Sequence, residues 1–132
     1  MTHASSWELE GHSKRTDAAH YWNRKMAPEL MADRSPNTYV QNIVSPMLVI
    51  HGDKDYRVTV GEGFRLWSDL LSESPDATDS EGKTVHRFLY FPDEGHWILK
   101  PQHARVWYST VEAFLAEHVL GTESEFLEKL GL

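Results

Sequence analysis

Two short apolar runs, each followed at once by polar side chains that can do chemistry, constrain this chain more than any other feature. Residues 46–50 read PMLVI and lead into HGDKDYRV, and residues 85–91 read VHRFLYF and lead into PDEGHW. Runs of this length and composition predict strands buried on both faces, as in a parallel sheet covered by helices. Because such a sheet presents its reactive groups at the carboxyl ends of its strands, the two polar loops should meet at one edge.

The remaining sequence predicts helices around these strands. The stretch after residues 61–63 predicts a helix with the apolar stripe Phe64, Trp67, Leu70 and Leu71. A second helix should begin at Pro101 and end at Gly121, with the stripe Trp107, Val111, Phe114, Leu115 and Val119. The alternation of strand and helix is that of a βαβα unit, whose strands are parallel.

The two ends and the long central loop carry weaker signals. Residues 1–45 should form a mostly helical and irregular segment, with a short helix that starts near Tyr21 and ends before Pro36, and a turn at 35–37. Residues 72–84 predict an exposed loop, and the capping-box sequence at 122–125 predicts a terminal helix.

Composition limits the class of protein. A length of 132 residues predicts a single domain, and a hydrophobic share of 40% suffices for a core. The net charge of −7, with no basic run, argues against nucleic-acid binding, and no stretch approaches the ~20 apolar residues of a membrane span. The chain has no cysteine, and its first residues do not resemble a signal peptide, so we expect a cytoplasmic protein.

A carboxylate and an imidazole are the groups that the two loops bring to the sheet edge. Asp55 lies in the first loop and His96 in the second, 41 residues later. Adjacent parallel strands lie about 4.8 Å apart, so short loops can place the Asp55 carboxylate within hydrogen-bond reach of the His96 ring. This is the chain order of the acid and the base in an α/β-hydrolase triad. Asp55 would orient the imidazole, and His96 would act as general base and then as general acid.

Other polar residues of the two loops have less specific interpretations. Asp53 is also a carboxylate and could by its chemistry be the acid in place of Asp55, but it is expected to be a solvated loop residue. His51 ends a strand and is expected to hydrogen-bond within its loop. Asp93 and Glu94 could suggest a metal site, but their spacing fits no known ligand motif, so we expect neither a metal nor a cofactor.

Both loops resemble those of a known family. SPMLVIHGDKDYRV at 45–58 resembles the acid strand and loop of prolyl oligopeptidase-family serine peptidases, which include dipeptidyl peptidases and acylaminoacyl peptidases. FLYFPDEGHW at 88–97 resembles the histidine loop of that family. Over roughly residues 20–120, the resemblance implies the C-terminal part of an α/β-hydrolase domain, with few parallel strands flanked by helices. It also implies hydrolysis of peptide bonds, with Asp55 as the acid and His96 as the base.

The serine of the triad has no good candidate in this sequence. The nearest match to a Gly-x-Ser-x-Gly elbow is GHSKR at 11–15, which lacks the closing glycine and follows no buried strand. Ser13 is therefore not expected to be the nucleophile. We expect an Asp/His-bearing C-terminal fragment of a serine peptidase, inactive alone, whose partners are a serine-bearing upstream half and a peptide substrate.

A non-catalytic role is the alternative. A fragment of a sheet exposes unpaired backbone groups along its edge, and these can pair with a second copy of the chain. The chain would then be an interaction or oligomerisation module, and a homo-oligomer is expected.

Overall fold

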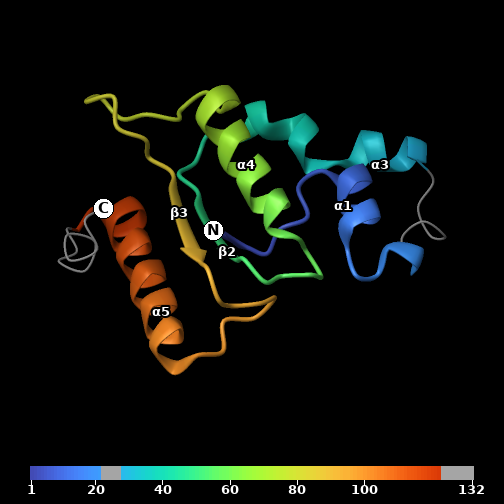
Figure 1. Cartoon of the computed structure of the whole chain (residues 1–132). Coiled ribbons are helices and arrows are strands. Elements are labelled where there is room, and N and C mark those ends of the chain that lie inside the picture. Colours follow the sequence, from blue (N-terminus) through green and yellow to red (C-terminus); the bar gives the residue numbers. More distant parts are fainter. Residues whose placement is uncertain (22–27, 123–132) are drawn as a thin grey trace.

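The computed structural model describes residues 1–21 and 28–122, and its centre is a three-stranded parallel sheet (Figure 1). The strands lie in the order β1-β2-β3, so β2 is the central strand. Their bounds are Thr2–His3 for β1, Leu48–Gly52 for β2 and Arg87–Phe91 for β3. A small parallel sheet flanked by helices confirms the predicted fold class.

Two of the three strands were predicted, and the third was not. β2 and β3 lie within two residues of the predicted runs, and Val49 pairs with Phe88 across them. β1 pairs with the other side of β2, where Thr2 lies opposite Val49. A two-residue strand carries no readable pattern, so β1 was not among the predicted elements, although the predicted fold of few parallel strands has room for it.

Helices cover both faces of β2, which explains its continuous apolar sequence. α4 (Val60–Glu73) lies on one face and α5 (Pro101–Leu115) on the other (Figure 1). All five residues of β2 are buried. Successive side chains alternate between the two helices because a strand has a period of two. Val49 packs toward α4 with Leu66 and Leu70, whereas Leu48 and Ile50 pack toward α5 with Phe91 and Phe114.

The buried face of α4 differs from the predicted stripe. Leu70 is buried as expected, but Phe64 and Leu71 are 48% and 44% exposed, and Leu66 takes an inner position. The face is rotated because Glu62 and Gly63 also point inward, toward the N-terminal segment and His51. Phe64 instead meets the ring of Phe88 edge-on, with the ring centroids 5.6 Å apart.

The N-terminal segment is held against α4 by buried polar contacts. The Trp7 indole donates a hydrogen bond to Asp69 at 2.7 Å, and its backbone N–H donates to Glu62 at 2.9 Å. The helices of this segment are α1 (Leu9–Arg15), α3 (Pro28–Arg34) and the 3₁₀ helix η1 (Pro36–Asn42). The helix predicted between Tyr21 and Pro36 lies partly outside the described residues, and its described part, α3, ends before Pro36 as expected. The predicted turn at 35–37 is the start of η1.

The C-terminal helix follows the prediction at both ends. α5 begins at Pro101 and continues into the π-helical turn η2 (Ala116–Leu120), which Gly121 ends at a φ of 65°. Of the predicted stripe, Trp107, Val111 and Phe114 pack on the sheet, whereas Leu115 and Val119 are exposed. The predicted terminal helix lies outside the described residues.

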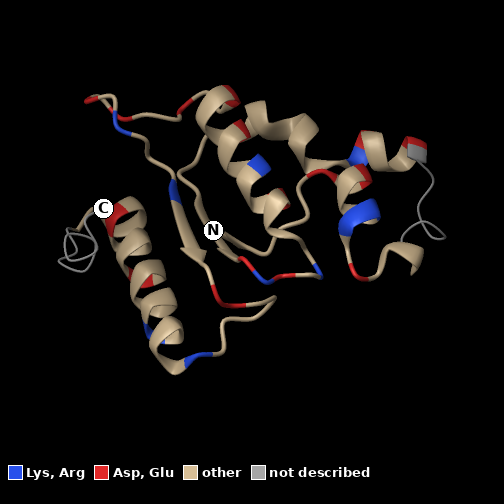
Figure 2. Cartoon of the chain, viewed as in Figure 1, with Lys and Arg blue, Asp and Glu red and all other residues tan. Residues whose placement is uncertain are grey.

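Charge is distributed over many elements. Lys and Arg residues are interspersed with Asp and Glu residues along the described ribbon, including the loop after β2 (Figure 2). No described helix is both long and apolar enough to cross a membrane.

Candidate active site

The loops that follow β2 and β3 leave the sheet at the same edge (Figure 1). The acid loop comprises residues 53–58, between β2 and α4, and the histidine loop comprises residues 92–100, between β3 and α5. Parallel pairing of the strands places both exits side by side, with Gly52 opposite Phe91. The polar residues of both loops are therefore neighbours.

Asp55 is a buried carboxylate with each oxygen in a separate interaction. The residue is 2% exposed. Its Oδ1 accepts hydrogen bonds from the backbone N–H groups of Arg57 and Val58 at 2.9 and 2.8 Å. Its Oδ2 lies 2.9 Å from Nδ1 of His96. Two backbone donors thus fix the carboxylate, and the free oxygen faces the imidazole.

His96 combines a buried contact with an accessible ring. Its side chain is 41% exposed, although its Nδ1 faces the buried Asp55. An ionised carboxylate only accepts hydrogen bonds, so the pair favours the tautomer with the proton on Nδ1. The lone pair of Nε2 is then free to take a proton. This is the arrangement that orients a histidine as a general base.

Glycine at position 52 allows the two loops to touch. A Cβ atom there would lie 2.4 Å from the carbonyl oxygen of Gly95 and 2.6 Å from that of Glu94. Two backbone hydrogen bonds reinforce the contact, from Asp53 N–H to the Phe91 carbonyl and from Lys54 N–H to the Glu94 carbonyl, both at 2.9 Å. Close backbone approach is a role that only glycine fills without strain.

The other histidine-loop and acid-loop residues take different places. Asp53 is exposed, as expected. His51 is fully buried, and its Nε2 lies 2.7 Å from the Val58 carbonyl, which closes the acid loop as predicted. Its ring also packs on Gly63 of α4. The sequence did not reveal that Glu94 would be buried, because its neighbour Asp93 is exposed and nothing in the pattern distinguishes the two carboxylates.

Ser13 lies inside helix α1 rather than at a sharp strand-to-helix turn. It is buried, and its hydroxyl donates a hydrogen bond of 2.7 Å to the Glu10 carbonyl. Five residues separate β1 from the start of α1. The local geometry therefore differs from that of a nucleophile elbow.

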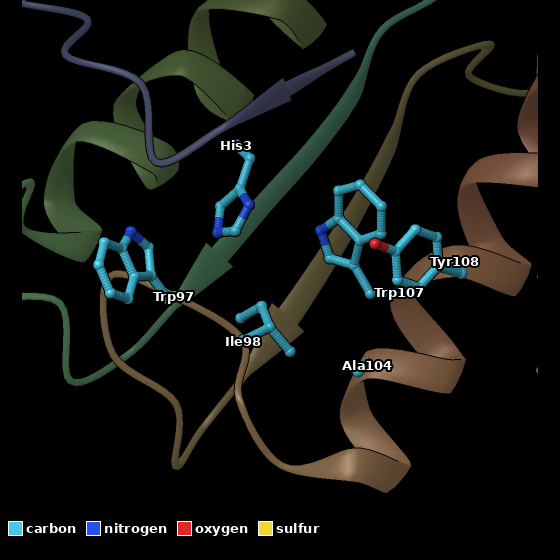
Figure 3. Close-up of a pocket in the computed structure, with 6 residues that line it drawn as sticks. All are labelled: His3, Trp97, Ile98, Ala104, Trp107 and Tyr108. Carbon is cyan, nitrogen blue, oxygen red and sulfur yellow. The ribbon is translucent and has the colours of Figure 1, made fainter.

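Two hollows lie beside His96. A cleft of about 480 Å³ contains His96 itself, and its walls include Lys54, Tyr56, Arg57 and Trp97. A smaller pocket of about 180 Å³ lies between the histidine loop, β1 and α5 and shares Trp97 with the first (Figure 3). Within the described residues, no cluster of three or more His, Asp or Glu side chains could hold a metal ion.

The aromatic pocket contains two buried nitrogen atoms without partners in the described part of the chain. These are Nε2 of His3 and Nε1 of Trp107. The indole nitrogen lies on the side of Trp107 that faces His3 (Figure 3). Burial lowers the pKa of His3, and the neighbouring His51 and His96 lower it further. The pocket thus adjoins the Asp55–His96 pair.

Comparison with known proteins places this geometry in a family. The sequence profile of the prolyl oligopeptidase family matches residues 2–122. The chain belongs to the prolyl oligopeptidase family. This membership confirms the predicted resemblance and makes the chain part of a hydrolase family of serine peptidases.

The relatives include dipeptidyl peptidases and an acylaminoacyl peptidase. Dipeptidyl-peptidase 5 of Porphyromonas endodontalis is 32% identical over 120 residues, which cover 83% of this chain and 16% of that protein. Dipeptidyl-peptidase 5 of Aspergillus fumigatus is 41% identical over 76 residues, which cover 58% of this chain and 9% of that protein. The acylaminoacyl peptidase of Pyrococcus horikoshii shares the fold, with a TM-score of 0.81 and 17% identity over 98% of this chain and 22% of its own. The chain therefore spans less than a quarter of each of these proteins.

Proposed function

We propose that Asp55 and His96 are the orienting acid and the general base of a serine peptidase that cleaves peptide bonds through an acyl-enzyme. His96 would take the proton of a serine hydroxyl as the serine attacks the peptide carbonyl, and would then protonate the leaving amine. Asp55 would stabilise the imidazolium formed in between. The observation that carries the proposal is the 2.9 Å contact between buried Asp55 and accessible His96, at the carboxyl edge of a parallel sheet.

The serine would come from a segment outside this chain. Ser13 hydrogen-bonds within α1, so it offers no hydroxyl for His96. The unpartnered nitrogens of His3 and Trp107 lie next to β1, whose outer edge has no strand partner among the described residues. Buried polar groups rarely lack partners, which supports a further protein segment at this edge. That segment would be a serine-bearing upstream half of the hydrolase domain.

It follows that the chain alone should be inactive, which a fluorophosphonate probe tests. The purified chain should show no more serine labelling than the same chain after heat denaturation, and no hydrolysis of dipeptidyl-coumarin substrates. Labelling of one serine in the native chain, lost in the His96→Gln variant, would contradict this and would locate a nucleophile within the chain.

A role as an oligomerisation module is the second candidate. β3 is also an edge strand in the described sheet, and an aromatic cluster of Phe64, Trp67, Phe88 and Tyr90 lies along it. Phe64 and Tyr90 are 48% and 39% exposed. An edge with apolar side chains favours pairing with another copy of the chain.

Light scattering tests this second role. The chain at micromolar concentration should scatter as a dimer or larger species, and Phe64→Glu should shift it toward the monomer. A stable, well-folded monomer of the unaltered chain would contradict the proposal. A cytoplasmic location is a separate proposal, which cell fractionation tests.

A further inference from the structure

Glu94 is a buried carboxylate in the histidine loop that proton transfer by His96 does not use. It is 4% exposed. One oxygen accepts a hydrogen bond from the Leu99 N–H at 3.2 Å, and the other accepts from the Lys100 N–H at 3.1 Å and lies 2.7 Å from Nδ1 of His103. Burial alone would raise the pKa of Glu94, but these hydrogen bonds hold it below its ordinary value. The side chain is therefore an ionised acceptor.

This carboxylate fastens the far end of the histidine loop to helix α5. The helix begins after Lys100, whose own side chain makes no capping hydrogen bond. The first N–H groups of a helix lack partners within the helix, and negative charge is favourable near them. Glu94 places a negative charge beside this helix start and accepts the N–H groups of Leu99 and Lys100, which immediately precede α5. Within the first turn of α5, Nδ1 of His103 lies 2.7 Å from its Oε1.

The backbone of the same residue fastens the near end of the loop to the acid loop. The Glu94 carbonyl accepts a hydrogen bond from the Lys54 N–H at 2.9 Å, one residue before Asp55. His96 thus lies between two anchors, the Glu94 carbonyl on one side and the Leu99 and Lys100 amides on the other. Glu94 accepts the hydrogen bonds of both anchors, with its carbonyl at the first and its carboxylate at the second.

We propose that Glu94 is a positioning residue that fixes His96 against Asp55. Its side chain sets the path of residues 95–100, and that path determines whether Nδ1 of His96 reaches Oδ2 of Asp55. The meaning of this role for catalysis rests on the proposed function. The geometric claim does not, because it concerns the resting chain and needs neither serine nor substrate.

Nuclear magnetic resonance of the full chain with ¹⁵N-labelled histidine tests the claim. The ¹⁵N shifts report the tautomer of His96, which should carry its proton on Nδ1 in the unaltered chain. Oε2 of Glu94 faces one donor and Oε1 faces two, so Glu94→Gln places an amide N–H against at least one of them. His96 should then become a mixture of tautomers. Exchange of the Leu99 and Lys100 amides should accelerate by at least about tenfold. Glu81→Gln, in the exposed loop, is the matched control and should change neither reading.

A second pair of variants covers the case in which Glu94→Gln does not fold. His103→Phe keeps the ring beside Phe91 but removes the donor to Glu94, whereas His103→Gln retains an N–H donor. The phenylalanine variant should disturb the His96 tautomer and the glutamine variant should restore it. A folded Glu94→Gln chain, or failing that a His103→Phe chain, with an unchanged His96 tautomer would overturn the proposal. Failure of the chain to support peptidase activity would leave these readings intact and would count only against the proposed function.

Discussion

At the scale of single residues, the two oxygens of Asp55 have different partners. Oδ1 accepts two backbone N–H groups of its own loop, and Oδ2 faces His96. The backbone donors hold the carboxylate in place whether or not the imidazole is present. The orientation of the carboxylate is therefore a property of the acid loop, and the tautomer of His96 follows from it.

Asp55→Asn should reverse that tautomer. The asparagine oxygen remains the better acceptor for the two backbone donors, so its NH₂ group would face Nδ1 of His96. The ring would then hold its proton on Nε2, the atom that must be free to act as a base. ¹⁵N shifts of labelled histidine measure the change. Asp53→Asn, at an exposed position in the same loop, should leave His96 unchanged, and the account fails if both variants behave alike.

Gly52→Ala should destabilise the chain by about 1–3 kcal/mol, because the added methyl group meets two backbone carbonyls that cannot move independently. Gly61→Ala is the control, because a Cβ atom at that helical position meets nothing within 4 Å. That change should be neutral or stabilising by up to about 1 kcal/mol. Urea unfolding measures both, and equal stability of the two variants would contradict the close loop contact.

The sequence indicated the residues that would carry the chemistry better than the residues that hold them in place. Asp55 and His96 could be predicted because a strand end, a carboxylate and an imidazole recur in a recognisable pattern. The roles of Gly52 and Glu94 could not, because each depends on backbone atoms more than 40 residues away or on a helix that begins seven residues later. No local pattern encodes such contacts.

At the scale of elements, a buried histidine links the N-terminal ends of β2 and β3. His86 is 1% exposed, and its Nδ1 accepts a hydrogen bond from the Met47 N–H at 3.1 Å. Burial lowers the pKa of His86, and the charges of Arg87 and His118 lower it further. The folded chain therefore favours the neutral ring, which is the form that can accept this bond.

The stability of the strand pair should fall in acid for that reason. Because the pKa of His86 is lower in the folded chain, the unfolded chain binds the proton more readily. The contribution of His86 to the free energy of unfolding is therefore fully present above its ordinary pKa of 6.5 and is lost as the pH falls below that value. His86→Gln, whose carbonyl can accept the same bond, should make the decline shallower between about pH 7.5 and pH 5.5. His20→Gln, at an exposed position, should not. Urea unfolding measures the free energy of unfolding across this pH range. If it changed with pH by the same amount in the unaltered chain, His86→Gln and His20→Gln, the assignment of the effect to His86 would be contradicted.

Element predictions succeeded where periodicity was strong. β2, β3 and α5 followed from apolar runs and from Pro101 and Gly121. β1 escaped notice because two residues show no period. In α4 the inward face includes Glu62, whose carboxylate accepts the Trp7 and Glu8 N–H groups, so tertiary hydrogen bonds rather than hydrophobic periodicity set the helix rotation.

At the scale of the whole molecule, the sheet has an acid and a base at one edge, and β1 and β3 have no outer strand partner among the described residues. Belonging to the prolyl oligopeptidase family gives the chain a serine-peptidase ancestry, while it spans only 16% of one dipeptidyl-peptidase relative. The proposed function therefore requires that Asp55 and His96 serve a nucleophile carried elsewhere.

A chimera measures this requirement most directly. In dipeptidyl-peptidase 5 of Porphyromonas endodontalis, the stretch that aligns with this chain is replaced by the chain itself. Under the proposed function the serine lies in the retained upstream part, and the acid and the base come only from this chain. Size-exclusion chromatography and thermal unfolding establish that each chimera is folded before hydrolysis of a dipeptidyl-coumarin substrate is measured.

The account predicts a folded chimera that hydrolyses the substrate. Its kcat should fall about 10⁴-fold in Asp55→Asn and about 10⁶-fold in His96→Gln, and remain unchanged in Asp53→Asn. A folded chimera that is inactive, or one whose activity survives His96→Gln, would contradict the claim that these two residues are the acid and the base.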